Sequence, residues 1–404
     1  MEILDVKFKN KNGDLLTGFL DLPTTQNAHN YVLFAHCFTC NKNFLAVRNI
    51  SRALTSKGFG VLRFDFTGLG ESEGDFADSN FSGNVEDLLS AALFLEENYE
   101  APTLLIGHSL GGAAVIFAAN ELAYVQAIAT IGTPADLTHV THLIKDDITK
   151  INSQGSARVN IGGRSFNIKK QFLDDLETRE LSSVLSKLNK SILILHSPQD
   201  STVEIKNAEK LYVAAKHPKS FISLDGADHL LSRRVDSTYV GELIGSWAVR
   251  YIPIPEAFTL KSDFKVLASL GEEGFTTNIK AGRHNLIADE PLSFGGNDFG
   301  PTPYDFLSAG LASCTSMTIQ MYARRKKWHV GTVETHVEHS KSHAIDCEEC
   351  ERSSAKIDTF NRRISITGDL DETQMARLLQ IADKCPVHKT LDDKVQINTV
   401  MDNR

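Results

Sequence analysis

The chain has 404 residues, which is too long for one ordinary domain and suits two, each with its own core. Hydrophobic residues make up 42% and charged residues 23%, as in globular proteins and unlike disordered or fibrous ones. The net charge of -9 argues against a nucleic-acid partner, because phosphate binding needs a basic field. The start of the sequence lacks the pattern of a secretory signal, and no run of about 18 apolar residues could span a membrane. We therefore expect a cytoplasmic protein without a membrane partner.

The first half predicts a mostly parallel sheet. A hairpin that turns at Asn12-Gly13 is expected to form an antiparallel edge. Short apolar runs follow, each ended by turn residues and then an amphipathic segment: 31–35, 60–64, 103–107, 127–132, 191–196 and 221–225. Such runs indicate buried parallel strands with crossover helices on both faces of the sheet.

A candidate nucleophile follows the strand predicted at 103–107. The sequence there is GHSLGG, and its G-x-S-x-G spacing places Ser109 on a sharp strand-to-helix turn. Glycines are needed at this turn because side chains would collide with neighbouring backbone. The hydroxyl is then exposed beside a helix N-terminus whose free N–H groups suit an oxyanion. The motif alone is weak evidence, and its position after a strand strengthens it.

A base and its orienting acid are expected on loops after later strands, in the order Ser, Asp, His. Asp200 follows the strand predicted at 191–196, and His229 follows the strand predicted at 221–225. Asp228 is a rival acid, but it adjoins His229 in sequence and should point elsewhere. The pattern predicts acyl transfer to water, with Ser109 attacking an ester or amide carbonyl.

The loop after the third strand, AHCFTCNKN, is expected to complete an oxyanion hole. Its Phe38 N–H and the N–H of Leu110, which follows the nucleophile, are the candidate donors. Cys37 stands where a His-Gly oxyanion motif has glycine. Cys37 and Cys40 form a C-x-x-C that could be metal-binding or redox-active, but the plainer interpretation is two small buried thiols. The six cysteines are too sparse for a disulfide scaffold and are expected to be reduced.

Residues 1 to about 250 resemble the α/β-hydrolase superfamily, including the segment RFDFTGLGES at 63–72. The resemblance implies an α/β-hydrolase domain over 1–252, with a cap inserted at about 137–190 that shapes the substrate pocket. It also implies a small-molecule acyl substrate. No cofactor is expected.

The second half begins after a proline-bearing linker at 249–258, so we expect a second domain over 258–404. Strand-like segments precede a helix that starts near Pro303, is apolar on more than one face and should be a buried central helix. Cys314 lies in the middle of this helix among small residues. A second amphipathic helix is expected to end at Cys385-Pro386.

The Gly-Gly pair, the proline, Cys314 and the late Cys385-Pro386 together resemble the OsmC/Ohr family of thiol peroxidases over about 260–404. The resemblance implies an α+β unit that forms a homodimer, an organic hydroperoxide substrate and a dithiol reductant. By position Cys314 resembles the peroxidatic thiol and Cys385 the resolving one. Such a thiolate attacks the peroxide to leave a sulfenic acid, and the second thiol condenses with it to a disulfide.

The family pairs its thiolate with an arginine that has a carboxylate partner. Arg283 is our candidate, with Asp305 or Glu290 as its partner. Many relatives carry glutamate directly after the proline before the central helix, where this chain has Tyr304. His388 is interpreted as structural.

A cluster near residues 336–350 offers a zinc site as an alternative, through His339, His343, Cys347 and Cys350. The alternation in THVEHS favours a strand, and its acidic neighbours favour a solvated loop. Two other hypotheses stay open for the whole chain. The OsmC-like half could serve only for dimerisation or ligand binding, and the hydrolase half could be a degenerate binding module.

Overall fold

The computed structural model describes residues 2–23, 28–161, 164–255, 260–271, 274–343 and 356–401. By its internal packing the chain divides into two units, Met1–Gly274 with Lys280–Arg283, and Phe275–Ile279 with His284–Arg404. The domain boundary expected at 252–258 lies earlier than this division and stays a prediction. Within the described residues, every helix is too short or too polar to cross a membrane.

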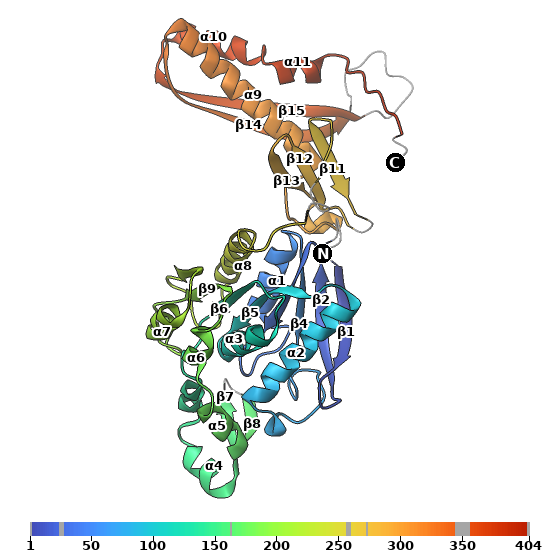
Figure 1. Cartoon of the computed structure of the whole chain (residues 1–404). Helices are drawn as coiled ribbons and strands as arrows, with labels where there is room; N and C mark the ends of the chain where they lie inside the picture. The colour runs from blue at the N-terminus through green and yellow to red at the C-terminus, as the bar shows by residue number, and fades with distance from the viewer. Residues whose placement is uncertain are drawn as a thin grey trace. The chain divides into compact units, whose positions relative to one another are not determined.

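The first unit is built on an eight-stranded sheet in the order β1-β2-β4-β3-β5-β6-β9-β10 (Figure 1). The strands are β1 (Glu2–Lys9), β2 (Leu15–Leu22), β3 (Asn30–Ala35), β4 (Phe59–Phe64), β5 (Pro102–His108), β6 (Ala127–Ile131), β9 (Ser191–His196) and β10 (Lys219–Ser223). The neighbours from β4 through β3, β5, β6 and β9 to β10 pair in parallel, whereas β1 with β2 and β2 with β4 pair antiparallel. The predicted mostly parallel sheet with an antiparallel edge is confirmed.

Helices cover both faces of this sheet. They are α1 (Leu45–Thr55), α2 (Phe81–Asn98), α3 (Leu110–Glu121), α7 (Lys206–Ala214) and α8 (Arg234–Ala248). Alternate residues of β3 point to opposite faces, so Val32 and Phe34 join the core beneath α1 and α8, while Leu33 and Ala35 join the core beneath α2 and α3. Burial on both faces explains why the strands are apolar at nearly every position.

The chain between β6 and β9 forms a small layer at the place expected for a cap. Its elements are η2 (Leu137–Ile144), α4 (Ile148–Gln154), β7 (Ser156–Ile161), β8 (Arg164–Lys169), α5 (Lys170–Glu177) and α6 (Leu181–Leu185). Strands β7 and β8 make a separate antiparallel pair. Phe172 and Leu176 of α5 are buried in the same apolar core as α2 and α3, so this layer packs on the core of the first unit.

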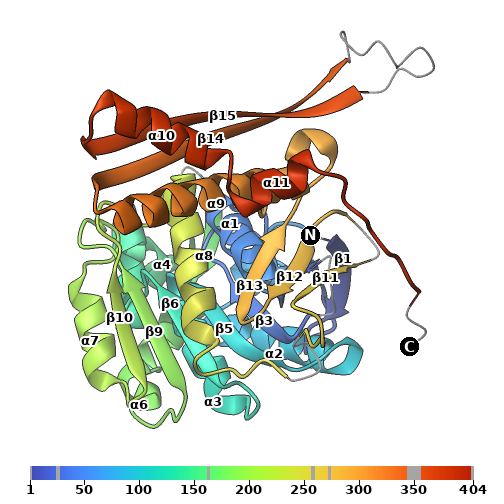
Figure 2. The ribbon, with the colours of Figure 1, turned by 90° about the horizontal axis from the view of Figure 1, so that it is seen from above.

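The second half of the chain is of the α+β type. Its elements are β11 (Val266–Leu270), β12 (Thr277–Ala281), β13 (His284–Ala288), η4 (Leu292–Phe294), α9 (Pro303–Lys326), β14 (His329–His343), β15 (Lys356–Asp369), α10 (Glu372–Ala382) and α11 (Pro386–Asp392). Strands β14 and β15 form a long antiparallel ribbon that runs along α9 (Figure 2). Helix α9 starts at Pro303 and has a capping box formed by Thr302 and Asp305.

Two expectations about the second half are wrong in detail. Within one chain α9 buries only the face formed by Leu311, Thr315, Ile319 and Ala323, while Met317 and Met321 are 65% and 70% exposed. The helix is not buried all round because the ribbon and α10 cover one side of it. The second helix, α10, ends at Ala382, and Pro386 begins α11 instead of stopping a helix. Proline suits this first helical position because no partner is needed for its missing N–H.

Candidate active site

Ser109 lies on the turn between β5 and α3, as the motif predicts. Its backbone φ is 56°, in the left-handed region that non-glycine residues seldom adopt. The turn is crowded, because a Cβ added at Gly107 would lie 2.3 Å from the Gly111 carbonyl oxygen. A Cβ added at Gly111 would lie 2.4 Å from the His36 carbonyl oxygen. The glycines of the motif therefore allow β5, α3 and the loop after β3 to meet at one point.

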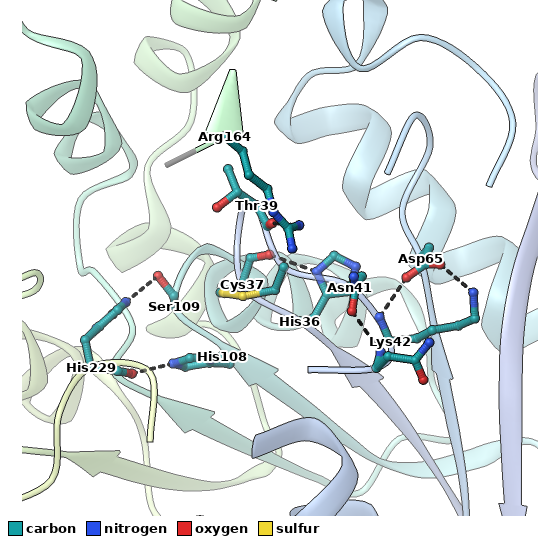
Figure 3. The surroundings of a disulfide bond; sticks show 12 residues. His36, Cys37, Thr39, Asn41, Lys42, Asp65, His108, Ser109, Arg164 and His229 are labelled. Atoms are coloured by element: carbon teal, nitrogen blue, oxygen red, sulfur yellow. Dashed lines mark hydrogen bonds and ion pairs between the residues drawn. A yellow bond between two sulfur atoms is a disulfide. The ribbon is translucent and has the colours of Figure 1, made fainter. Parts of the chain in front are cut away.

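Ser109, His229 and Asp200 form a hydrogen-bonded chain. The Ser109 hydroxyl lies 3.1 Å from His229 Nε2 (Figure 3), and His229 Nδ1 lies 2.7 Å from Asp200 Oδ2. Burial opposes ionisation of Asp200, but the hydrogen bond from His229 and those from the Thr202 and Val203 amides outweigh it, so the pKa of Asp200 is lowered. An ionised Asp200 holds the Nδ1–H tautomer of His229, which leaves Nε2 free to accept the serine proton.

Asp228, the rival acid, has other partners. Its carboxylate accepts hydrogen bonds from the backbone N–H and the hydroxyl of Ser232. Asp228 thus begins the turn that leads into α8, and Asp200 is the carboxylate that contacts His229.

His108, the residue before Ser109, is hydrogen-bonded to the backbone of His229. Its Nε2–H donates to the backbone carbonyl of His229 over 2.7 Å. Burial lowers the pKa of His108 to about 3, with the nearby His229 as a further cause, so the ring is neutral. We did not anticipate this contact, although the position of His108 inside GHSLGG could have suggested it.

The loop after β3 differs from prediction at its cysteines. Cys37 and Cys40 are joined by a disulfide, with their Cα atoms 5.2 Å apart, so they are not two free thiols. The Cys40 N–H donates to the Cys37 carbonyl over 3.0 Å, and this tight turn brings the two side chains together. Our expectation rested on the compartment assumed for the protein and did not consider the turn. The disulfide lies beside Ser109 (Figure 3).

His36 fixes the peptide that carries the Phe38 amide. Its Nδ1–H donates to the Cys37 carbonyl over 2.8 Å. The Cys37 carbonyl and the Phe38 N–H belong to one planar trans peptide and point in opposite directions, so holding the first orients the second. Burial lowers the pKa of His36, which keeps the ring neutral. Leu110 is the first residue of α3, where helix N–H groups have no intrahelical acceptor.

The two predicted thiols of the second unit lie on neighbouring elements. Cys314 is half-buried on α9, and Cys385 is fully buried at the start of α11. The Cys385 sulfur accepts hydrogen bonds from the His388 N–H over 3.2 Å and from the Thr315 hydroxyl over 3.7 Å. Because Thr315 directly follows Cys314, these contacts bring Cys385 to the α9 turn that carries Cys314. His388 therefore contributes its backbone to this site.

Arg362 on β15, which we had not singled out, joins the hydrogen-bond network of Cys385 through Thr315. Its Nη1 donates to the Thr315 hydroxyl oxygen over 2.9 Å and to the Ala382 carbonyl over 3.2 Å. Its Nη2 pairs with Asp383 over 2.6 Å. No local motif marks Arg362, because it is brought to the site by the pairing of β14 with β15.

The proposed roles of Arg283 and its partners stay predictions. Arg283 is exposed in the turn between β12 and β13, and no hydrogen bond or ion pair among the described residues joins it to Cys314. The Asp305 carboxylate accepts hydrogen bonds from the Thr302 amide and hydroxyl in the capping box of α9. Glu290 donates its amide N–H to Asp289.

Only part of the alternative zinc cluster lies within the described residues. His339 pairs with Asp358 over 2.8 Å and stacks on Tyr304, so its ring has partners without a metal. Cys347, Cys350 and the side chain of His343 lie outside the described residues. Across the part of the chain that is described, no three His, Cys, Asp or Glu side chains gather as a metal site would require.

Comparisons with known proteins agree with this architecture. Residues 26–154 match the family model of serine aminopeptidase S33, and residues 295–400 match that of OsmC-like protein. The crystal structure of the esterase domain from a Rhodothermus marinus protein is 50% identical, with a TM-score of 0.53, covering 62% of this chain and 99% of that one. Est1E from Butyrivibrio proteoclasticus, solved with ferulic acid, is 20% identical with a TM-score of 0.51, covers 61% of this chain and 99% of its own, and shares the fold.

Two curated relatives are less similar in sequence than the Rhodothermus marinus domain. The uncharacterized protein YfhR of Salmonella typhimurium is 25% identical over 236 residues, which are 57% of this chain and 75% of that protein. The mouse mitochondrial palmitoyl-protein thioesterase ABHD10 is 27% identical over 179 residues, 43% of this chain and 59% of its own.

The fold and the serine on its strand-to-helix turn define the first unit as an esterase-like α/β hydrolase. The chain belongs to the proteins that join an N-terminal α/β hydrolase to a C-terminal OsmC-like domain.

Proposed function

We propose that the first unit is a serine hydrolase that cleaves small-molecule acyl esters. The observation that carries this proposal is the chain from Ser109 through His229 to Asp200, with the serine on the turn between β5 and α3. A serine with no base in reach would be a weak nucleophile at neutral pH.

The proposed mechanism uses these contacts. His229 Nε2 takes the Ser109 proton as the serine oxygen attacks the acyl carbonyl, and Asp200 stabilises the imidazolium. The Phe38 and Leu110 N–H groups hold the negative oxygen of the tetrahedral intermediate. His229 then gives its proton to the leaving alcohol, and water repeats the sequence to release the acid.

The substrate class is supported by the surroundings of the loop and by similarity. The Phe38 ring contacts Phe76 and Phe172, with centroids 5.5 and 5.1 Å apart, and Phe76 contacts Phe166 of the cap. This aromatic cluster suits an apolar acyl or alcohol group. The 50% identical domain is named an esterase, which favours an ester over an amide.

Replacing Ser109 tests the proposal. We expect Ser109→Ala to abolish hydrolysis of p-nitrophenyl acetate and butyrate while leaving the fold intact, as measured by turnover and circular dichroism. Ser90→Ala is a matched control, because its hydroxyl only bonds the Glu86 carbonyl within α2. Full turnover in folded Ser109→Ala would contradict the assignment of Ser109 as the nucleophile.

For the second unit we propose thiol-dependent reduction of organic hydroperoxides. The proposal is supported by the half-buried Cys314 and the buried Cys385, whose sulfur accepts a hydrogen bond from Thr315, the residue after Cys314 on α9. The Cys314 thiolate would attack the peroxide, releasing an alcohol and leaving a sulfenic acid. Cys385 would condense with it, releasing water, and an external dithiol would reduce the disulfide.

Two variants and a size measurement test this second activity. Cys314→Ser should abolish cumene hydroperoxide loss with dihydrolipoamide, and Cys385→Ser should retain one turnover and leave a sulfenic acid. The exposed apolar face with Met317 and Met321 supports a homodimer, which sedimentation would measure. If a dimer forms but hydroperoxide is not consumed, the alternative stands that this half serves for dimerisation or ligand binding.

A further inference from the structure

Lys42 is a lysine whose side chain is only 2% exposed, at the far end of the loop that carries Phe38. Its ammonium donates to Asp65 over 2.6 Å, to Glu71 over 2.7 Å and to the Thr17 hydroxyl over 3.1 Å. All three of its protons therefore have acceptors. Figure 3 shows Lys42 and Asp65 on the side of the loop opposite His229.

The backbone of Lys42 is held as firmly as its side chain. Its N–H donates to Asp65 Oδ1 over 2.7 Å, so one carboxylate binds both the amide and the ammonium of the same residue. Its carbonyl accepts a hydrogen bond from Arg63 over 2.7 Å. Arg63 is fixed in turn by two hydrogen bonds to Asp21, of 2.7 and 3.0 Å. Both peptide groups of Lys42 are thus tied to the end of β4.

The loop between residues 36 and 42 is then fastened at both ends. At its start the His36 carbonyl lies against the first turn of α3, where a Cβ on Gly111 would clash with it. At its end is the clamp formed by Lys42, Asp65 and Arg63. Phe38 lies between these two points, and only three residues separate it from Lys42.

We propose that Lys42 is a positioning residue that sets the place of the Phe38 N–H opposite Ser109. This inference rests on the proposed hydrolase function. Lys42 does not touch the substrate; it acts through the loop. A lysine holds this position better than an apolar residue, because one ammonium binds three acceptors at once: Thr17 on β2, and Asp65 and Glu71 in the segment after β4.

A role in stability alone would be a poor reason to bury this lysine. Removing two charges from water costs about as much as their attraction returns, so apolar residues of similar volume often serve equally well. Positioning of a catalytic group is a stronger reason, because a displacement of about 1 Å at such a group can cost about a hundredfold in rate. Loss of Lys42 should therefore lower kcat more than it changes KM.

The test compares Lys42→Met with wild type on two substrates, a phenyl ester and its thionoester. The thionoester carries sulfur in place of the carbonyl oxygen and accepts hydrogen bonds poorly, so it gains little from an oxyanion hole. We expect Lys42→Met to lower kcat for the oxygen ester about tenfold to a hundredfold, with KM within about threefold of wild type. The kcat for the thionoester should fall much less. The ratio of the oxygen-ester rate to the thionoester rate should therefore fall.

Controls separate this effect from folding and from the proposed function. Lys42→Met with Asp65→Asn leaves no unpaired charge in the core and keeps an acceptor for the residue 42 amide, so it decides the matter if the single variant fails to fold. Lys11→Met removes an exposed lysine, paired only with Glu86 at the surface, and should keep wild-type rates. If wild type shows no turnover that depends on Ser109, the proposed ester hydrolysis itself is contradicted.

The result that overturns the inference is specific. If folded Lys42→Met, or the double variant, keeps the wild-type kcat and the wild-type ratio of ester to thionoester rates while Ser109→Ala is inactive, Lys42 only stabilises the fold. A uniform loss on both substrates, with the ratio unchanged, also contradicts positioning of an oxyanion donor.

Discussion

At the scale of single residues, the geometry of the first unit separates groups that look alike in sequence. Asp200 and Asp228 both lie on loops that follow strands, and both come before His229 in the sequence. Of the two, Asp200 is the one that contacts the imidazole, with its Oδ2 2.7 Å from His229 Nδ1. The sequence allowed Asp200 to be preferred, because the order of strands and loops is regular in this fold. The position of His108 inside GHSLGG could have suggested its contact, but no motif marks Lys42, whose partners are side chains distant in sequence.

Replacing each aspartate tests this distinction. Asp200→Asn should lower kcat for ester hydrolysis by up to about 10⁴-fold, because the imidazole loses its orienting carboxylate and adopts the wrong tautomer. Asp228→Asn should stay within about threefold of wild type, since its partners are in the Ser232 turn. Steady-state kinetics on folded protein measures both, and equal losses would contradict the assignment of the acid.

His108 gives a prediction about stability and pH. Burial lowers its pKa to about 3, whereas an unfolded histidine titrates near 6.5. Between these values the unfolded chain binds a proton that the folded chain does not, so His108 favours the folded state above pH 6.5 and this contribution is lost as pH falls. The slope it adds is at most about 1.4 kcal/mol per pH unit. His108→Gln removes that slope.

The measurement uses the two tryptophans, one in each unit. Trp328→Phe leaves Trp247 on α8 as the reporter of the first unit. Urea unfolding at pH 7.5 and pH 5.0 should show a smaller loss of stability in His108→Gln than in the parent. The same pH dependence in both proteins would count against a buried neutral His108, although His36 and His196, whose pKa values burial also lowers, keep part of the slope.

At the scale of elements, periodicity and turn residues were sufficient for the large sheet, the hairpin and the starts of α3 and α9. They failed where the cause is not local. Met317 and Met321 gave α9 the pattern of a helix buried all round, but a single chain covers only one of its faces. Pro386 suggested a stop, whereas it begins α11. Arg362 reaches the thiols through strand pairing, which no short motif records.

Arg362 ties the ribbon to α9 and to the end of α10, so its loss should disturb Cys385. We expect Arg362→Met to slow condensation of Cys314 sulfenic acid with Cys385 about tenfold, because the Thr315 hydroxyl and the Ala382 carbonyl lose their donor. Dimedone trapping followed by mass spectrometry measures how long the sulfenic acid lasts. Arg363→Met is the matched control, since neighbouring strand residues point to opposite faces. An unchanged lifetime would show that Arg362 has no part in the thiol site.

At the scale of the whole molecule, two units with separate cores each carry a separate set of reactive side chains. Both domain types could be predicted because each has its own motif in its own half: G-x-S-x-G in the first, and Cys314 with Cys385-Pro386 in the second. What covers the exposed face of α9 could not be predicted from one chain, because that depends on assembly.

The two activities should be separable. Ser109→Ala should lose ester hydrolysis and keep hydroperoxide reduction, and Cys314→Ser should do the reverse, because each proposed site has its own side chains within its own unit. Assays of both reactions on both variants of the full chain measure this. Loss of both activities in either folded variant would indicate coupled sites.

The most direct test of the central claim is labelling of the intact protein with a fluorophosphonate, read by intact mass and peptide mapping. A nucleophilic serine activated by His229 should take up one phosphonyl group, at Ser109, with loss of ester hydrolysis in step with labelling. Ser109→Ala should take up none. No adduct on wild type, or an adduct at another residue while Ser109→Ala still hydrolyses esters, would contradict the account.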